Sequence, residues 1–230
     1  YSKQTAQKLI AHARDLEIEI LPEIEFPAHA LTTTIIYPQL RDAADVGTEV
    51  SVQGYHRNSV NPALAETWQM FNEICREVAD LFPFAHLHIG GDELPPDTWA
   101  GSPAVDDLKR QNGLSTHQDV QGYCMERMAG ELRKIGVTPC AWEEAALGCN
   151  GGIANGAMLF AWTAQGPGLD AARRGHDVVM CPAQHTYLDM AHTADGDDWG
   201  ASWAANFGLA ETLDWDPVPI DEPHLETRIR

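Results

Sequence analysis

The chain has 230 residues, of which 44% are hydrophobic and 21% are charged, a composition typical of a single globular domain rather than a disordered segment. No run approaches the roughly 18 consecutive apolar residues of a membrane-spanning helix. The net charge of -19, from 15 Lys and Arg against 34 Asp and Glu, would repel phosphate backbones and anionic lipids. We therefore expect neither nucleic acid nor a membrane as a partner.

Predicted helices and strands alternate along the chain. Apolar residues recur three and four positions apart, the spacing of a helix with one buried face, at residues 6–16, 64–81, 116–134 and 169–174. Short apolar runs predict strands at residues 18–22, 85–91, 137–142, 157–162 and 177–182. This alternation is typical of parallel βαβ units, in a doubly wound sheet or a barrel. No internal repeat, second domain or nucleotide-binding glycine motif is evident.

The five cysteines are scattered along the chain without a CxxC pair. Their spacing indicates neither a zinc ribbon nor a dense disulfide framework. We expect most of them to be small buried apolar residues.

Acidic, aromatic and histidine residues follow each predicted strand at its carboxyl end. In chain order they are Glu23, Glu25 and His29, then Asp92 and Glu93, then Trp142, Glu143 and Glu144, then Trp162, and finally Tyr187 and Asp189. In a barrel these strand ends share one face, which is where the active site is built. Any one of these residues could be a solvated loop residue or a core aromatic, but their recurrence favours a site. Tryptophans beside carboxylates favour a carbohydrate, because aromatic faces pack against sugar rings; Trp68, on a helix stripe, is assigned to the core.

The segment HIGGDE, residues 88–93, carries the sharpest chemical signal. Two glycines at the end of an apolar strand allow a tight turn beside a ligand. Adjacent carboxylates on that turn can face one pocket, where their like charges raise the pKa of one of them. A general acid needs such a raised pKa to hold its proton near neutral pH. Without the glycines and the strand, Asp92 and Glu93 would be an ordinary surface pair.

A second interpretation of the same strand is a metal site. His86 and His88 are two residues apart, so on a strand they project from the same face, and with Asp92 they could hold zinc. No third histidine or cysteine lies in an equally favourable position. We therefore favour a core role for His88 over that of a zinc ligand.

Together these segments resemble family 20 of the glycoside hydrolases, the β-N-acetylhexosaminidases, over residues 1 to about 217. The matching pieces are ILPEIEFPAHA at 20–30, LHIGGDELPPDTWAGSP at 87–103, AWEEA at 141–145, AW at 161–162 and TYLD at 186–189. The sequence departs from the family pattern at Glu25, where Asp is frequent, and at Ala28, where Gly is frequent. His29 is retained, so we expect loop geometry rather than chemistry to differ.

The resemblance implies substrate-assisted hydrolysis with retention of anomeric configuration. Glu93 would be the general acid and base, and Asp92 would orient the 2-acetamido group of the substrate. The implied substrate-binding residues are His29, Trp142, Trp162, Tyr187 and Asp189. Tyr187 would donate to the acetamido oxygen, the two tryptophans would wall the pocket, Asp189 would bind a hydroxyl group and His29 would support the site.

The implied partner is an oligosaccharide or glycoconjugate that contains N-acetylhexosamine. The resemblance implies no metal and no organic cofactor. The family resemblance further implies an exported, periplasmic or extracellular protein. One alternative of a different class is a non-catalytic relative that binds a glycan without cleaving it. The intact pair of Asp92 and Glu93 argues against that alternative.

The resemblance also implies the α/β architecture of a (β/α)₈ barrel, which takes about 250 residues and eight strands. The predicted strands correspond to about strands three to seven, so we expect residues 1–230 to form one incomplete catalytic barrel. The missing strands would lie before Tyr1 and after Arg230. Alone, the chain would then expose two unpaired strand edges.

Overall fold

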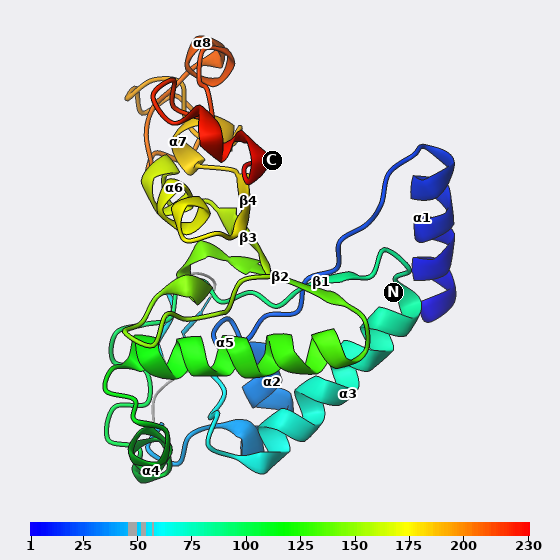
Figure 1. The fold of residues 1–230 in the computed structure, drawn as a ribbon, viewed down its shortest axis with the longest axis vertical. Helices are drawn as coiled ribbons and strands as arrows, with labels where there is room; N and C mark the ends of the chain where they lie inside the picture. The colour runs from blue at the N-terminus through cyan, green and yellow to red at the C-terminus, as the bar shows by residue number, and fades with distance from the viewer. Residues whose placement is uncertain (46–49, 52–53, 57) are drawn as a thin grey trace. The chain divides into compact units, whose positions relative to one another are not determined.

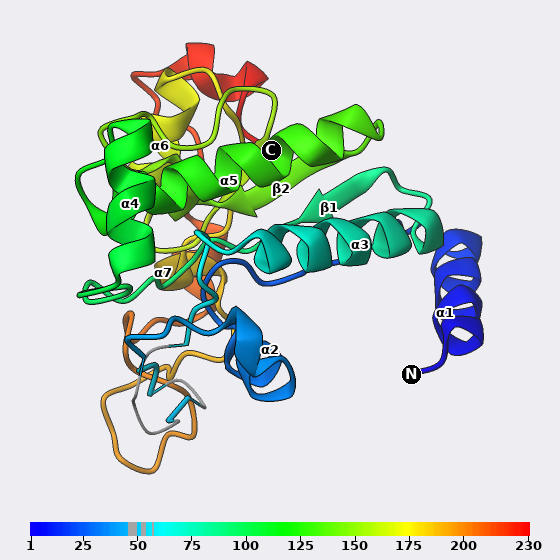
Figure 2. The same ribbon diagram turned by 90° about the horizontal axis from the view of Figure 1, so that it is seen from below.

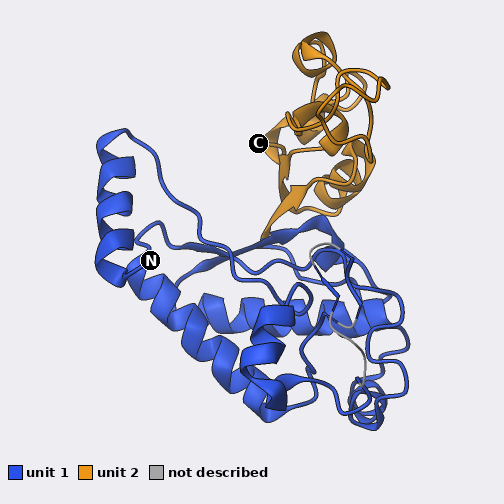
Figure 3. Cartoon of the chain, turned by 180° about the vertical axis from the view of Figure 1, so that it is seen from behind, with its two compact units in different colours: residues 1–157 blue, residues 158–230 orange. Residues whose placement is uncertain are grey.

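The computed structural model describes residues 1–45, 50–51, 54–56 and 58–230 as two compact units. One unit spans residues 1–157 and the other spans residues 158–230 (Figure 3). Both have the α/β character that the sequence predicts. In the part of the chain that is described, no helix combines the length and apolarity needed to cross a bilayer.

The first unit contains two parallel strands and the long helices that pack beside them (Figure 1). Its elements are α1 (Lys3–Asp15), α2 (Leu31–Ile36), η1 (Pro38–Leu40), α3 (Ala65–Leu81), β1 (His86–His88), α4 (Pro103–Asn112), α5 (His117–Lys134), β2 (Thr138–Trp142) and η2 (Glu143–Ala146). In the β1–β2 register His86 lies opposite Thr138 and His88 opposite Cys140. Helices α3 and α5 run alongside these strands (Figure 2).

The second unit is a smaller βαβ arrangement with a long irregular segment. Its elements are β3 (Met158–Ala161), α6 (Gln165–Arg173), β4 (Asp177–Met180), α7 (Ala183–Thr186), α8 (Leu209–Leu213) and η3 (Pro223–Thr227). Strands β3 and β4 are parallel, with Met158 opposite Asp177 and Ala161 opposite Met180. Helix α6 packs on both strands, as a crossover helix does.

Most predicted elements are confirmed, but the strand expected at residues 18–22 is wrong. That segment is extended and makes a single parallel bridge one residue later, between Glu23 and His88. The Ile24 N–H donates to the His88 carbonyl at 2.9 Å, and the His88 N–H donates to the Pro22 carbonyl at 3.0 Å. Because β1 is only three residues long, the pairing has no room to extend into a regular strand.

The core of the first unit contains an aromatic cluster between α3 and the segment before α2. Phe26 packs against Phe71 with ring centroids 4.8 Å apart and against Trp68 at 5.4 Å. Trp68 is 4% exposed, and its indole N–H donates to the Pro62 carbonyl at 2.8 Å. The assignment of Trp68 to the core is confirmed. Three cysteines, Cys75, Cys124 and Cys140, are also buried, and all five cysteines are free thiols.

Helix α5 begins at a capping box that also fixes a neighbouring loop. The Thr116 hydroxyl accepts from the Asp119 N–H, and the Asp119 carboxylate accepts from the N–H of Thr116. The other Asp119 oxygen accepts from the Cys149 N–H at 2.6 Å. These backbone hydrogen bonds, the one from Thr116 first, lower the pKa of Asp119 to about 2. Asp119 is therefore ionised at neutral pH and ties residues 147–152 to the helix.

We expect Leu132→Ala in α5 to lower the free energy of unfolding by about 2–5 kcal/mol, because it leaves a cavity at a fully buried position. Urea unfolding followed by circular dichroism measures the change. The matched control is Leu9→Ala on α1, where the side chain is 50% exposed and we expect less than about 1 kcal/mol. Equal losses in the two variants would contradict this packing.

Candidate active site

The candidate catalytic residues lie on the turn that follows β1. Gly90 and Gly91 have φ values of 64° and 96°, a conformation that favours glycine. A Cβ atom on Gly90 would collide with the Glu25 carboxyl, and one on Gly91 would lie 2.8 Å from the Met125 Cε. The two glycines therefore allow the turn to approach both the Glu23–Glu25 segment and α5.

A histidine lies between the two candidate catalytic carboxylates. His29 Nε2 is 3.3 Å from Asp92 Oδ2 and 3.2 Å from Glu93 Oε2. The side chains are only 14%, 16% and 29% exposed for His29, Asp92 and Glu93 respectively. The hydrogen bond to Asp92 and the nearby negative charges raise the pKa of His29 to about 9, against the effect of burial. At neutral pH His29 is therefore an imidazolium ion.

A second pair of carboxyl groups, Glu23 and Glu25, lies behind this triad. Burial, with the charges of Asp92 and Glu23, raises the pKa of Glu25 to about 8. Glu25 thus keeps its proton at neutral pH and donates it in a hydrogen bond to Glu23. Burial opposes ionisation of Glu23, but hydrogen bonds from His88, Glu25 and Trp142 lower its pKa.

Glu23 connects this pair to the tryptophan that follows β2. The Trp142 indole N–H donates to Glu23 Oε1 at 2.8 Å, and His88 Nδ1 lies 3.0 Å from the same oxygen. The His88 and Trp142 rings meet edge to face with centroids 4.8 Å apart. The orientation of Trp142 is therefore set by Glu23, whose hydrogen-bond partner Glu25 has its pKa raised by the charge of Asp92.

Two side chains from other elements hold the backbone of the turn at residues 90–93. The Glu93 N–H donates to Glu144 Oε1 at 3.1 Å, and the Gln121 side-chain amide donates to the Gly91 carbonyl at 2.5 Å. In the sequence Glu144 is one of several carboxylates that follow a predicted strand. Gln121 carries no signal there because it lies inside an ordinary helix.

Tyr55 is a further site residue that the sequence did not reveal. Its hydroxyl group makes a hydrogen bond with Glu93, and burial together with that carboxylate raises the pKa of Tyr55. The Tyr55 and His29 rings meet edge to face at 5.7 Å. Tyr55 lies in a loop between predicted elements, so no periodicity or motif marked it.

The second unit gathers the other predicted aromatic residues. Trp162, directly after β3, stacks on Tyr187 with centroids 6.4 Å apart and an interplanar angle of 18°. Trp203, which the sequence did not single out, meets both rings edge to face at 5.8 Å. Asp189 is exposed two residues after Tyr187, and its carbonyl accepts from the Ala201 N–H at 2.8 Å. This unit thus presents flat aromatic surface beside an exposed carboxylate.

The structure thus brings Asp92, Glu93 and His29 into direct contact. Trp142 is bonded to Glu23, which is hydrogen-bonded to Glu25. Trp162 and Tyr187 are in contact with each other in the second unit. The two groups of residues belong to different units.

The metal interpretation with His86, His88 and Asp92 is not supported. His86 Nδ1 faces the Phe84 carbonyl at 3.0 Å and its ring stacks on Phe84, while His88 faces Glu23. Within the described ranges, the one set of three potential ligands that meet closely is His29, Asp92 and Glu93, within 4.8 Å of one another. In this set His29 Nε2 lies 3.3 Å from Asp92 Oδ2 and 3.2 Å from Glu93 Oε2, which are direct contacts between the side chains.

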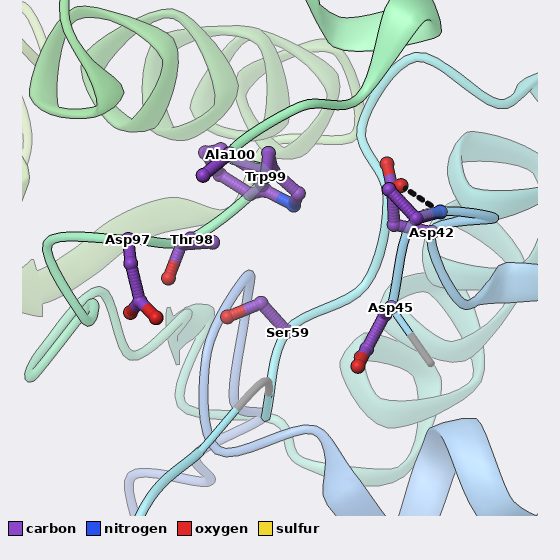
Figure 4. A pocket seen from close by; sticks show the side chains of 8 residues that line it. Asp42, Asp45, Ser59, Asp97, Thr98, Trp99 and Ala100 are labelled. Atoms are coloured by element: carbon purple, nitrogen blue, oxygen red, sulfur yellow. Dashed lines mark hydrogen bonds between the residues drawn. The ribbon is translucent and has the colours of Figure 1, made fainter. Parts of the chain in front are cut away.

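A small cavity lies against the loop that precedes α4, and it is lined by Asp42, Asp45, Ser59, Asp97, Thr98 and Trp99 (Figure 4). Its volume of about 20 Å³ holds about one water molecule and no sugar ring. Asp42 accepts hydrogen bonds from the Ala44 N–H and the Asn61 side chain, both at 2.7 Å, and from the Ser102 hydroxyl. The cavity is therefore part of the loop architecture and not the candidate active site.

We expect the His29 imidazole to stay protonated until the pH approaches 9. The stability that its protonation contributes is complete below pH 6.5, the ordinary value, and is lost as the pH rises through about 9. Asp92→Asn should lower the pKa of His29, because it replaces the charged partner that contributes most to the shift by a neutral amide. ¹⁵N NMR of the imidazole measures this pKa. Asp106→Asn, at an exposed position of α4, is the control and should have no effect. A His29 pKa that Asp92→Asn leaves unchanged would contradict the contact.

Glu25→Gln should make the protein more stable above pH 8 relative to wild type while changing little at pH 4. The carboxyl group ionises near 4.5 in the unfolded chain but near 8 in the folded protein, so wild-type stability falls as the pH rises across this interval. A glutamine keeps the size of the protonated acid and removes this dependence. Chemical unfolding measured at several pH values tests it, with Glu66→Gln on the exposed side of α3 as the control. A free energy of unfolding that changes in parallel with pH in wild type and Glu25→Gln would contradict the placement of a proton on Glu25 at neutral pH.

The comparisons with known proteins agree on one family. Residues 1–228 match the catalytic domain of glycosyl hydrolase family 20. The β-hexosaminidase of Vibrio furnissii is 31% identical over 233 residues, which cover 100% of this chain and 38% of that protein. The β-hexosaminidase of Porphyromonas gingivalis is 30% identical over 190 residues, covering 82% of this chain and 24% of that protein.

A solved structure shows the same fold. The family 20 exo-β-N-acetylglucosaminidase of Vibrio harveyi, in complex with N-acetylglucosamine, superposes with a TM-score of 0.88 at 34% identity. The match covers 100% of this chain and 36% of that enzyme. The chain thus spans little more than a third of the length of the Vibrio proteins that it matches. On the evidence of its catalytic-domain match, this chain belongs to glycosyl hydrolase family 20.

Proposed function

We propose that this chain carries the catalytic pair of a β-N-acetylhexosaminidase, which removes terminal non-reducing β-linked N-acetylglucosamine or N-acetylgalactosamine from oligosaccharides or glycoconjugates. The contact of one protonated histidine with both Asp92 and Glu93 carries the proposal. The enzymes of Vibrio furnissii and Vibrio harveyi, whose names state hexosaminidase and N-acetylglucosaminidase activity, support the substrate class.

In the first step Glu93 donates a proton to the glycosidic oxygen as the bond to the anomeric carbon breaks. The carbonyl oxygen of the substrate's own 2-acetamido group attacks that carbon, so the protein supplies no nucleophile. Asp92 holds the acetamido N–H and stabilises the positive charge that the cyclised group acquires. In the second step water attacks the anomeric carbon and breaks its bond to the acetamido oxygen. Glu93, now a carboxylate, takes a proton from that water, and the anomeric configuration is retained.

His29 supports this chemistry as a fixed cation. Once Glu93 has given up its proton, it and its sequence neighbour Asp92 are two like charges on one turn, and they repel each other. The imidazolium ion within 3.3 Å of both offsets this repulsion and fixes the orientation of each carboxyl group. Tyr55 constrains Glu93 from another side through its hydroxyl group.

The remaining predicted residues would bind the sugar. Trp142, oriented by its hydrogen bond to Glu23, would provide part of the wall around the acetamido methyl group. In the second unit, Trp162 would pack against the acetamido methyl group, Tyr187 would donate to the acetamido oxygen and Asp189 would bind a hydroxyl group. Trp203 extends the aromatic surface that Trp162 and Tyr187 form, and we include it among the sugar-binding residues.

We further propose that the chain supplies about strands three to seven of a (β/α)₈ barrel, so that residues 1–230 form one partial catalytic barrel. Its parallel strand pairs and its coverage of 36–38% of the Vibrio relatives support this assignment. The activity is therefore to be measured on the complete protein that contains this chain.

In that protein, Glu93→Gln should lower kcat on phenyl β-N-acetylglucosaminide by about 10²–10⁴-fold, because a glutamine cannot protonate the leaving group. Asp92→Asn should also be severe, since it removes the charge that stabilises the cyclised intermediate. Glu131→Gln, on the outer part of α5, is the matched control and should be neutral.

The substrate itself provides a second check. The corresponding glucoside, which has a hydroxyl in place of the acetamido group, should react far more slowly because it cannot assist its own hydrolysis. Wild-type rates from Glu93→Gln would refute the assignment, and equal rates on the two sugars would indicate an enzyme nucleophile. Sugar binding without turnover in the wild type would favour a non-catalytic relative.

A further inference from the structure

The backbone conformation of Glu93 is unusual for a residue with a side chain. Its φ is +50°, in the left-handed region that residues with a Cβ atom seldom occupy. Such a conformation persists only where the surrounding structure enforces it, and it often accompanies function. The direction of the Glu93 side chain follows from this backbone conformation, so whatever holds the backbone also aims the carboxyl group.

Glu144 makes the contact that holds it. Glu144 Oε1 accepts a hydrogen bond from the Glu93 N–H at 3.1 Å. A carboxylate acceptor makes this bond stronger than one between neutral groups. Because Glu144 lies in η2 directly after β2, the bond joins the turn after one strand to the turn after its neighbour.

The position of Glu144 is itself well determined. The Leu147 N–H donates to the Glu144 carbonyl at 3.0 Å, and the Ile153 N–H donates to the Ala145 carbonyl at 2.8 Å. Asp119 holds the following loop through the Cys149 N–H at 2.6 Å. The carboxylate of Glu144 therefore projects from an anchored turn, as a positioning group must.

We propose that Glu144 is a positioning residue that aims the Glu93 carboxyl group at the glycosidic oxygen through the Glu93 backbone N–H. This inference depends on the proposed function, in which Glu93 is the proton donor. Glu144 does not touch the substrate and donates no proton to it. Loss of the hydrogen bond releases the left-handed backbone, so the acid spends less time in reach of the oxygen that it protonates.

The test compares leaving groups, because only a poor leaving group depends on a well-placed acid. In the complete protein, Glu144→Ala should lower kcat/KM, which reports the cleavage step, on 4-methoxyphenyl β-N-acetylglucosaminide by about 30–100-fold. On the 2,4-dinitrophenyl glycoside, whose phenolate departs without a proton, the loss in kcat/KM should stay below about 3-fold. KM on the methoxyphenyl substrate should change by less than about 2-fold, since the sugar contacts are intact.

Two conservative variants keep the test decisive even where Glu144→Ala folds poorly. Glu144→Gln retains an oxygen acceptor at the same distance and should restore most of the rate on the methoxyphenyl substrate. Glu144→Asp keeps the charge but withdraws the acceptor by one methylene, and should show the same leaving-group pattern as Glu144→Ala in weaker form.

The controls separate positioning from a general loss of structure. Glu131→Ala removes a carboxylate bonded to Lys134 on α5 and should leave both rates unchanged. Leu132→Ala destabilises the core, and any loss it causes should be equal on the two substrates. Equal losses on the two substrates in Glu144→Ala, or no loss in Glu144→Ala and Glu144→Asp, would overturn the proposal.

The result for Glu93→Gln separates this inference from the proposed function. A leaving-group dependence in Glu93→Gln that is absent from every Glu144 variant would overturn the positioning role alone. Wild-type rates from Glu93→Gln on both substrates would overturn the proposed function and the positioning role with it.

Discussion

The site depends on one constraint, the concentration of negative charge at a single turn. Asp92 and Glu93 are adjacent, and the charges of Asp92 and Glu23 both raise the pKa of the half-buried Glu25. The structure accommodates these charges with protons, one on His29 between Asp92 and Glu93 and one on Glu25 beside Glu23. In a chain with a net charge of -19, these two protons remove part of the negative charge where the carboxyl groups are packed most tightly.

The packing around the turn makes this arrangement rigid. Gly90 allows the backbone to pass over the Glu25 carboxyl, and Gly91 allows it to approach Met125 of α5. Gln121 from the same helix holds the Gly91 carbonyl, and Glu144 holds the Glu93 N–H. Glu93, the proposed acid, is thus positioned by backbone contacts from α5 and η2, while His29 and Tyr55 constrain its carboxyl group. Contacts to its backbone N–H and to its side-chain carboxyl group together fix the position of Glu93.

The sequence revealed those parts of the molecule that local pattern determines. The apolar stripes of α3 and α5 span several turns, so their periodicity is unambiguous, and the glycine pair before Asp92 and Glu93 marks a turn with few alternatives. The strand predicted at residues 18–22 is wrong because a short apolar run does not show whether a partner strand continues beside it. Helix α4 was also missed, although Ser102 caps it and Pro103 opens it, because its apolar stripe is weak.

The parts of the site that depend on distant contacts could not be read from the sequence. Tyr55 reaches Glu93 from a loop, and Trp203 meets Tyr187 from an irregular segment 16 residues away in sequence. Glu144 stood in the sequence as one carboxylate among several after β2, and nothing local distinguishes a hydrogen bond to the backbone of residue 93 from solvation. The proton on Glu25 likewise follows from burial and two neighbouring charges that only the fold brings together.

The central claim is that Asp92 stabilises a substrate whose own acetamido group has closed onto the anomeric carbon. The most direct test is the affinity of the complete protein for a thiazoline-fused N-acetylglucosamine analogue, compared with N-acetylglucosamine itself, by titration calorimetry. As a mimic of the cyclised intermediate, the analogue should bind at least about 100-fold more tightly, and Asp92→Asn should remove most of that advantage. Equal affinity for the two sugars, or an advantage that Asp92→Asn leaves intact, would contradict the account.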